Sequence, residues 1–416
     1  MQVGVRKGGI VTELLCYNAR LNLEPVPLPM PITWMFLARI LPAVLGVVSL
    51  TLGFLPSARA EIMEHLYEAS VPVADQSDEE RKKALGLGLN SVLVRVSGVQ
   101  EPETNPVIKA ALAVPEQYLQ EFTYESVPDQ ELAKAVASPT VIPATIPPRL
   151  VMKIGFSPAS VKSLLQKSGM TLWPRQRPAV LVWVLIEKPG EGRTLLAPAY
   201  LQQEAEYRGL ALVVPMNDPA HLAELTADTV WQLDRTVVEQ IGQGYGINTV
   251  LVGRVTQLAV DQWSGSWLFV STLPGEDSLK STGLTPDTAP VMMESTTTSL
   301  EAFQRAGLDY VVHQLISQYA IPPGGLTQNI ALEVSGVESF SDYAGLLHYL
   351  HDLEPVRSIA IQQLSQHRIY CMLEIEGSVE VLQRLITLGA FLVSGPQMAK
   401  ESSTTPMPLQ YRMSTH

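Results

Sequence analysis

The sequence predicts an α/β protein that becomes α+β at its C-terminus: small α/β modules around a mixed sheet, followed by a ferredoxin-like βαββαβ sandwich. The first indication is Pro178 to Ile186 (PAVLVWVLI), because an apolar run of this length after a proline is typical of a strand buried on both faces. The second is the alternation of strand-like and helix-like segments on either side of that run. The third is the βαββαβ order of the segments beyond Pro322.

Composition bounds the class of protein. The 416 residues are enough for two or three domains, and 46% hydrophobic with 17% charged residues is too apolar for a disordered chain. The formal net charge is -12, with no Lys/Arg cluster, so nucleic acid is excluded as a partner and anionic membrane surfaces are disfavoured.

Residues 35–60 have the layout of a secretory signal peptide. Arg39 precedes an apolar run from Ile40 to Leu55, and the small residues Ala58 and Ala60 suit cleavage after Ala60. We therefore expect a periplasmic or secreted protein with no stable membrane anchor after cleavage. The alternative is an uncleaved anchor, since Met35 to Leu55 nearly reaches the ~20 apolar residues that a span needs. Residues 1–34 are expected to be untranslated or a leader extension, with translation starting at Met30 or Met35.

Cysteine usage restricts the covalent chemistry. The chain has two cysteines, Cys16 and Cys371, and the first precedes the predicted cleavage point. A single remaining thiol cannot form an internal disulfide or a paired-cysteine metal site.

The N-terminal segment, 61–138, is predicted to be α/β. Ser77 with Glu80 forms a capping box for a helix that Gly98 can end. Extended structure over Leu66 to Val73, a helix over Pro106 to Ala113 and a strand over Gln120 to Ser126 complete it. Residues 139–149 are predicted to be a Pro-rich linker.

The central domain is placed at 150–320. Leu150 to Phe156 as a strand, a helix capped by Ser157 and stopped by Gly169, and the long apolar strand together predict a right-handed parallel crossover. The later segments are predicted as follows: a helix over Tyr200 to Arg208, a strand over Leu210 to Val214, helix from Asp218 to about Gln243, a hairpin from Thr249 to Val255 and Trp263 to Thr272, a loop over 273–297, and a helix capped by Thr298 that runs to Tyr319.

The C-terminal domain is placed at 326–395 and is predicted to be ferredoxin-like. Its expected segments are a strand at Ile330 to Val334, a helix at Asp342 to Asp352, a hairpin of Val356 to Leu364 with Ile369 to Ile375, a helix from Ser378 to Thr387, and a last strand at Ala390 to Val393. The tail, 396–416, is predicted to be disordered.

Three stretches carry a family resemblance: LYEASVPVADQSDEERKKALGLGLNSVLVRVSG, SPASVKSLLQKSGMTLWPRQRPAVLVWVLIE and INTVLVGRV. On these, the chain resembles the exported bacterial domain-of-unknown-function family two thousand and sixty-six over most of Glu61 to about Gly395. The resemblance implies export and an uncharacterised role, and it supplies no functional residues.

The sequence contains none of the standard reaction signatures. G-x-S-x-G, S-x-x-K, H-E-x-x-H, a Walker loop and a G-x-G-x-x-G after a strand are all absent. Gly242, Gly244 and Gly246 come closest, but they precede a strand and are best interpreted as a helix stop. We therefore predict no catalytic, cofactor-binding or metal-binding residues.

Four weaker patterns each have a structural interpretation that we favour. His348 and His351 could share a metal-binding helix face, but a solvated face explains them. Asp75, Asp78, Glu79 and Glu80 lack the calcium-loop spacing, and helix capping explains them. We interpret one further set of polar residues as surface ion pairing, because its members enter at opposite ends of the strands and cannot all form one site: Arg175, Arg177, Asp218 and Arg254. We interpret a set of tryptophans as core packing, with a sugar- or peptide-binding platform as the alternative: Trp173, Trp183, Trp231, Trp263 and Trp267.

These observations predict a non-catalytic binding or scaffolding protein of the bacterial envelope with envelope proteins as partners. The alternative is an envelope hydrolase whose Asp, Glu and His residues are assembled from distant parts of the chain. A deep pocket with two convergent carboxylates, or with a histidine and a carboxylate, would favour the hydrolase. Shallow grooves and an open sheet edge or an apolar patch would favour binding.

Overall fold

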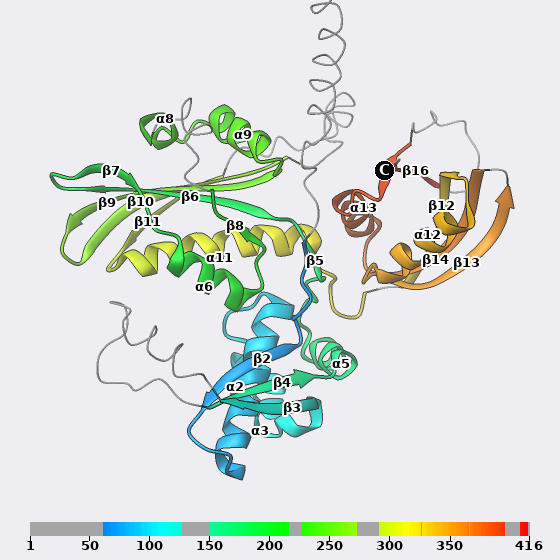
Figure 1. Ribbon diagram of the computed structural model, residues 1–416, viewed down its shortest axis with the longest axis horizontal. Coiled ribbons are helices and arrows are strands. Elements are labelled where there is room, and N and C mark those ends of the chain that lie inside the picture. The colour runs from blue at the N-terminus through cyan, green and yellow to red at the C-terminus, as the bar shows by residue number, and fades with distance from the viewer. Residues whose placement is uncertain are drawn as a thin grey trace, which may run out of the picture. The chain divides into compact units, whose positions relative to one another are not determined.

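A computed structural model describes residues 61–126, 150–215, 227–272, 291–325, 327–365, 367–395 and 408–414. The predicted signal peptide, the Pro-rich linker and Asp218 lie outside these ranges. The described part has a mixed α/β architecture with both mixed and antiparallel sheets, which confirms the predicted fold class at this level (Figure 1).

The N-terminal part is a three-stranded antiparallel sheet, ordered β2-β4-β3, packed against helices. Ser77 accepts a hydrogen bond from the Glu80 amide, and Gly98 ends α2 in the left-handed conformation at φ 68°, as predicted. The elements are β2 (Glu68–Val73), α2 (Asp78–Ser97), α3 (Pro106–Ala113), β3 (Leu119–Ser126), β4 (Leu150–Phe156) and α5 (Pro158–Ser168), with 3-10 turns at Pro102–Thr104 and Pro115–Tyr118.

The predicted parallel crossover from Leu150–Phe156 to the long apolar strand is wrong. β4 pairs antiparallel with β2 and β3, and Met152, Ile154 and Phe156 pack into the core formed with α2. Helix α5 adds Val161, Leu164 and Leu165 to the same core. Residues 150–168 therefore pack with the N-terminal segment, because the alternate apolar face of β4 is covered there rather than against the central sheet.

The central sheet has the order β11-β10-β9-β6-β7, with β8 beside the start of β6. Strand β6 is parallel to β9 and β8, and antiparallel to β7. The two-residue strands β1 (Glu61–Ile62) and β5 (Gln176–Arg177) pair with each other, and β5 precedes β6 in the chain. The elements are β6 (Val180–Lys188), β7 (Gly192–Leu195), α6 (Ala199–Arg208), β8 (Leu212–Val213), α8 (Ala227–Trp231), α9 (Arg235–Gly244), β9 (Thr249–Ala259), β10 (Gln262–Ser271), β11 (Val291–Thr297) and α11 (Leu300–Tyr319).

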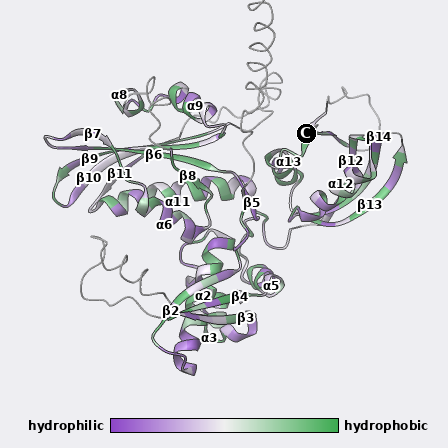
Figure 2. Cartoon of the chain, viewed as in Figure 1, coloured by the Kyte–Doolittle hydropathy of each residue, from purple (hydrophilic) through white to green (hydrophobic). Residues whose placement is uncertain are grey.

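Strand β6 is the central, doubly covered strand that its apolar run predicts. Helices α6 and α11 cover one face of the sheet, and α8 and α9 cover part of the other (Figure 1). Figure 2 shows hydrophobic residues along β6 between these layers. Side chains therefore alternate between two cores, with Val182 and Val184 in one and Leu181 and Trp183 in the other.

Three predictions for the central segment need correction. The end of the predicted loop, 291–297, is strand β11, which pairs antiparallel with β10. Ser299, not Thr298, caps α11 and accepts from the Ala302 amide. Within the described residues, the predicted helix that runs to Gln243 is two helices, because Leu233 has φ 53° and Asp234 caps α9.

The C-terminal sheet has five strands in the order β13-β14-β12-β16-β15, with α12 and α13 on one face. Ser339 and Asp342 form a reciprocal capping box at the start of α12. The elements are β12 (Thr327–Val337), α12 (Phe340–Asp352), β13 (Val356–Ser365), β14 (His367–Glu376), α13 (Val379–Leu388), β15 (Leu392–Ser394) and β16 (Leu409–Met413).

The prediction of a disordered tail over 396–416 is wrong for its described part. Strand β16 lies between β12, to which it is parallel, and β15, to which it is antiparallel. Tyr411 is buried there, so the strand belongs to the core. Because β16 separates β12 from β15, the four-stranded ferredoxin-like arrangement predicted for 326–395 is not confirmed.

Within the described ranges, no helix has both the length and the apolarity needed to cross a membrane.

Candidate functional site

A polar groove lies on the central sheet at the carboxyl ends of the parallel strands β6 and β9. Its volume is about 510 Å³. In open α/β sheets, ligands bind beyond the carboxyl ends of parallel strands, so the position of the groove is informative. Its lining includes Glu187 from β6, Arg254 and Thr256 from β9, Ser264 and Ser266 from β10, Glu294 and Thr296 from β11, and Trp231 from α8.

Strand register places these side chains on one face in two rows. Ser266 of β10 lies directly opposite Arg254 on one side and Glu294 on the other. Residues directly opposite each other across a sheet point to the same face. The charged row is therefore guanidinium, hydroxyl and carboxylate on three successive strands.

The second row lies beside the charged row and consists mostly of hydroxyl side chains. Thr256 lies opposite Glu187 in the parallel pair and opposite Ser264 in the antiparallel pair, and Ser264 lies opposite Thr296. This row presents three hydroxyls and a single carboxylate beside the charged row.

The polar rows continue an apolar surface of the same sheet face. Leu181, Trp183, Val250, Val252 and Leu268 are buried under α8 and α9. Since the strands extend beyond these two helices, the side chains that follow toward the carboxyl ends of β6 and β9 are polar. The groove thus begins where the helical cover ends, at Trp231.

A network of ionic contacts fixes one wall of the groove. Arg193 of β7 contacts Glu187 at 3.2 Å and Asp228 at 2.7 Å, and its guanidinium lies 4.5 Å from the Trp231 ring centroid. Thr256 donates its hydroxyl to the other Glu187 oxygen at 3.2 Å. Both oxygens of Glu187 are therefore already engaged.

Arg254 is held in place by one hydrogen bond. Its Nη1 donates to the Trp231 carbonyl at 2.9 Å. A guanidinium carries five N–H donors, so most of them remain for a ligand. Glu294 is exposed, and no ion pair or hydrogen bond joins its carboxylate to another described residue.

The two carboxylates of the groove are poorly placed for joint catalysis. Glu187 and Glu294 lie on β6 and β11, with β9 and β10 between them. Three strand spacings amount to about 14 Å between the backbones. Arg193 also holds the Glu187 carboxylate from β7, on the side of β6 away from Glu294.

The sequence places four polar residues near strand ends. Asp218 lies outside the described residues, and of the other three Arg254 alone lines the groove. Arg175 is exposed before β6. Arg177 is fully buried, and its guanidinium stacks 3.7 Å above the Trp173 ring centroid. It donates to the carbonyls of Pro174, Gly209, Arg95 and Trp173.

Burial lowers the pKa of Arg177 to about 9, a value that still leaves the guanidinium charged at neutral pH. Its partners Arg95 and Gly209 lie at the C-terminal ends of α2 and α6, where carbonyls lack helical donors. Arg177 therefore has a structural role rather than the surface ion pairing expected from sequence.

The remaining predicted patterns have structural explanations. His348 and His351 are exposed on α12, and His348 lies 3.4 Å from Asp352. No group of three His, Cys, Asp or Glu side chains is arranged to hold a metal ion in the described part of the chain. Asp75 accepts from the Ser77 amide at 2.8 Å, consistent with capping. The five tryptophans are all buried core residues, and Trp231 also lines the groove.

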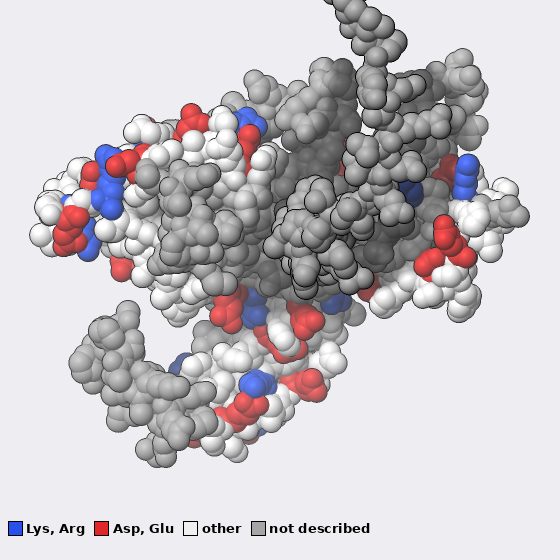
Figure 3. All heavy atoms as spheres, turned by 45° about the horizontal axis from the view of Figure 1, so that its top comes forward, with Lys and Arg blue, Asp and Glu red and all other residues white. Residues whose placement is uncertain are grey.

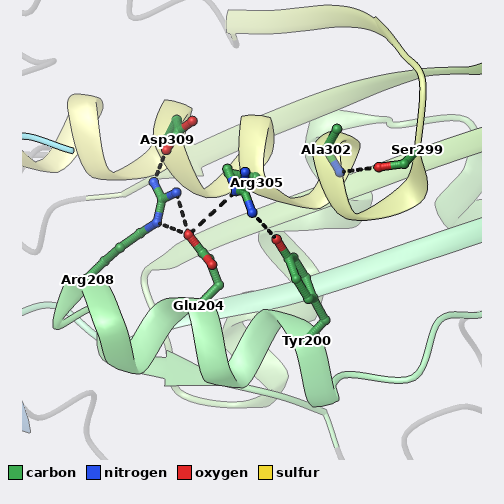
Figure 4. A network of polar contacts seen from close by, with 7 residues as sticks. All are labelled: Tyr200, Glu204, Arg208, Ser299, Ala302, Arg305 and Asp309. Atoms are coloured by element: carbon green, nitrogen blue, oxygen red, sulfur yellow. Dashed lines mark hydrogen bonds and ion pairs between the residues drawn. The ribbon is translucent and has the colours of Figure 1, made fainter. Parts of the chain in front are cut away.

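Helices α6 and α11 are joined by a second polar network on the opposite face of the sheet (Figure 4). The buried Arg208 pairs with Glu204 at 2.7 Å and with Asp309, and Arg305 donates to the Tyr200 hydroxyl at 3.0 Å. Arg208 and Asp309 also border a cavity of about 380 Å³ near Gly98. Because Arg208 and Asp309 pair with each other, we interpret them as a structural link between α6 and α11.

Sequence reasoning missed Glu187, Ser266 and Glu294. The usable signal was the alternation of WSGSW in β10, where two serines separate buried tryptophans and so must share the opposite face. Glu294 could not be placed, because its segment was predicted to be a loop.

Comparison with known proteins corrects the predicted relationship. Residues 60–174 match a family described as Domain of unknown function (DUF8605). This is a different family from number two thousand and sixty-six, so that resemblance is wrong. The match covers β1 to α5 and stops before β6, so it leaves the groove outside. No curated protein matches the chain.

Proposed function

We propose that the chain is an exported, non-catalytic binding protein of the bacterial envelope and that its ligand docks in the groove at the carboxyl ends of β6 and β9. The observation that carries the proposal is the charged row of Arg254, Ser266 and Glu294. These three side chains present hydrogen-bonding groups at the position where open α/β sheets bind ligands.

Export is part of the proposal and depends on the leader. Residues 35–60 combine the apolar run and the small-residue cleavage point of a signal peptide. On the face drawn in Figure 3, acidic and basic side chains lie interspersed, which suits a soluble envelope protein better than one that binds anionic polymers. Cell fractionation with N-terminal sequencing should recover a mature chain that begins at Glu61.

The hydrolase alternative is less well supported. It requires an acid and a base that converge on one reaction centre, but the groove carboxylates lie three strands apart and Glu187 is bound to Arg193 and Thr256. None of the described histidines lines the groove.

A scaffolding role is the second candidate, and the C-terminal sheet favours it. We propose that this part is a ferredoxin-like sandwich extended by β16. Its edge strand β13 is ten residues long and largely exposed, with Leu364 65% exposed, and pairs only with β14 among the described residues. Such an edge can accept a strand from an envelope protein. Gln363→Pro should then abolish the binding of such an envelope protein in a pull-down with the purified chain.

The binding proposal is tested by thermal unfolding of the purified chain in envelope extract separated by dialysis into small solutes and macromolecules. A ligand that contributes about 1 kcal/mol should raise Tm by about 2 to 4 °C. Ser264→Trp, which fills the groove, should remove the shift, and Ser264→Thr, which keeps the hydroxyl, should retain it. Equal shifts for both variants, or no shift with either fraction, would overturn the proposal.

A further inference from the structure

Two unlike charges stand at opposite ends of one row of the groove. Arg254 and Glu294 share a face and are separated by Ser266 on the strand between them. Two strand spacings place their backbones about 10 Å apart, and no ion pair joins the two side chains in the structure. The row therefore offers a positive and a negative subsite to a single bound molecule.

We propose that the groove binds a small zwitterion, an amino acid or a dipeptide, with the ligand carboxylate on Arg254 and the ligand ammonium on Glu294. This inference rests on the proposed function, because it names the ligand class of that same groove.

The positive subsite suits a carboxylate. The Trp231 carbonyl takes one N–H of Arg254 and so fixes the guanidinium, whereas its other donors can form the parallel pair of bonds that a carboxylate accepts. The nearest other carboxylate of the groove, Glu187, is occupied by Arg193 and Thr256 and does not neutralise Arg254.

The negative subsite suits an ammonium group. Among the described residues, the Glu294 carboxylate has no cationic partner, and the two flanking groove positions on its strand and the next, Thr296 and Ser264, are uncharged. An ammonium can donate to the carboxylate and to a neighbouring hydroxyl together.

Volume limits the size of the ligand. The groove of about 510 Å³ is in the size range of small-ligand sites, so an amino acid or a dipeptide fits it. Ser266, which is 7% exposed, lies beneath the middle of the ligand and can bond its central polar group.

Calorimetric titration of the full chain with glycine and glycylglycine tests the inference. At least one of the two should bind, and its N-acetylated and C-amidated forms should bind about tenfold more weakly, because each lacks one ion pair. Glu294→Gln should weaken the zwitterion about tenfold and leave the N-acetylated form within twofold. Glu125→Gln, which removes an exposed carboxylate from β3 in a different sheet, is the matched control and should change nothing.

Arg254→Gln should give the complementary pattern, with loss of the zwitterion and little effect on the C-amidated form. Equal binding of the N-acetylated and free forms would overturn the inference. Failure of both probes, with the extract-dependent Tm shift and its sensitivity to Ser264→Trp retained, would overturn this inference and leave the proposed function standing. Loss of that shift as well would remove both.

Discussion

Replacement of Arg177 by methionine tests the structural role of its buried guanidinium. The side chain is fully buried and donates to four backbone carbonyls, those of Pro174, Gly209, Arg95 and Trp173. Methionine has a similar length but no donor, so Arg177→Met keeps most of the volume and removes all four hydrogen bonds.

The expected cost follows from these four carbonyls. A buried acceptor left without a donor costs about 1 to 3 kcal/mol, so four of them cost at least about 4 kcal/mol. Removal of a buried cation returns part of this, because its burial is unfavourable and lowers the pKa of Arg177 to about 9. We therefore expect Arg177→Met to lower the free energy of unfolding by about 3 kcal/mol.

Urea unfolding followed by circular dichroism measures the change. Arg175→Met is the matched control, since this arginine is two residues earlier and exposed, and it should stay within about 0.5 kcal/mol of the wild type. A change below about 1 kcal/mol for Arg177→Met would refute the structural role argued for this guanidinium.

Five further tests examine the packing and the leader. Gly307→Ala should destabilise by about 2 kcal/mol in thermal unfolding, because a Cβ there overlaps the Trp267 indole; a neutral effect would contradict the packing of α11 on β10. Tyr411→Ala should cost about 3 kcal/mol, whereas the exposed Arg412→Ala should cost little, and equal effects would argue against β16. Burial raises the pKa of Cys371 to about 11, so this thiol should react with a disulfide reagent at pH 8 far more slowly than in urea. Because the pKa of Cys371 is raised in the folded state, its contribution to stability is full below pH 9 and is lost as the pH rises through about 11. Urea unfolding of the wild type and of Cys371→Ala at a series of pH values measures this loss. The denatured native protein should show one thiol if residues 1–60 are removed, and a second, Cys16, would contradict cleavage.

Local signals in the sequence predicted the individual elements well. The run from Pro178 to Ile186 identified the central strand, because continuous apolarity is required where both faces are covered. Ser77 and Ser157 placed the starts of α2 and α5, since a side-chain acceptor at the N-cap acts within three residues.

Long-range pairing was the main source of error. The sequence of β4 is compatible with a strand in either the N-terminal or the central sheet. It pairs antiparallel with β2 and β3 because its apolar face is buried in the core of the N-terminal part. β11 and β16 were missed because their short, polar-rich sequences gain strand structure only from β10 and from β12 with β15.

The groove could be predicted only in part. Arg254 was singled out near a strand end, but its partner position depends on the register that sets Ser266 between it and Glu294. Register across three strands is a tertiary property, because it depends on hairpin geometry and on the covered apolar face. Glu187 and Glu294 therefore became candidates only once the sheet was assembled.

Fluorine NMR of the chain labelled with 5-fluorotryptophan tests the ligand groove most directly. Trp231 lines the groove, whereas Trp173 and Trp267 are fully buried elsewhere and serve as internal references. With Trp231→Phe to assign its resonance, addition of envelope extract should move the Trp231 signal and leave the two references in place. An unmoved Trp231 signal, or a shift of the references alone, would contradict the claim that this groove is where the protein binds its ligand.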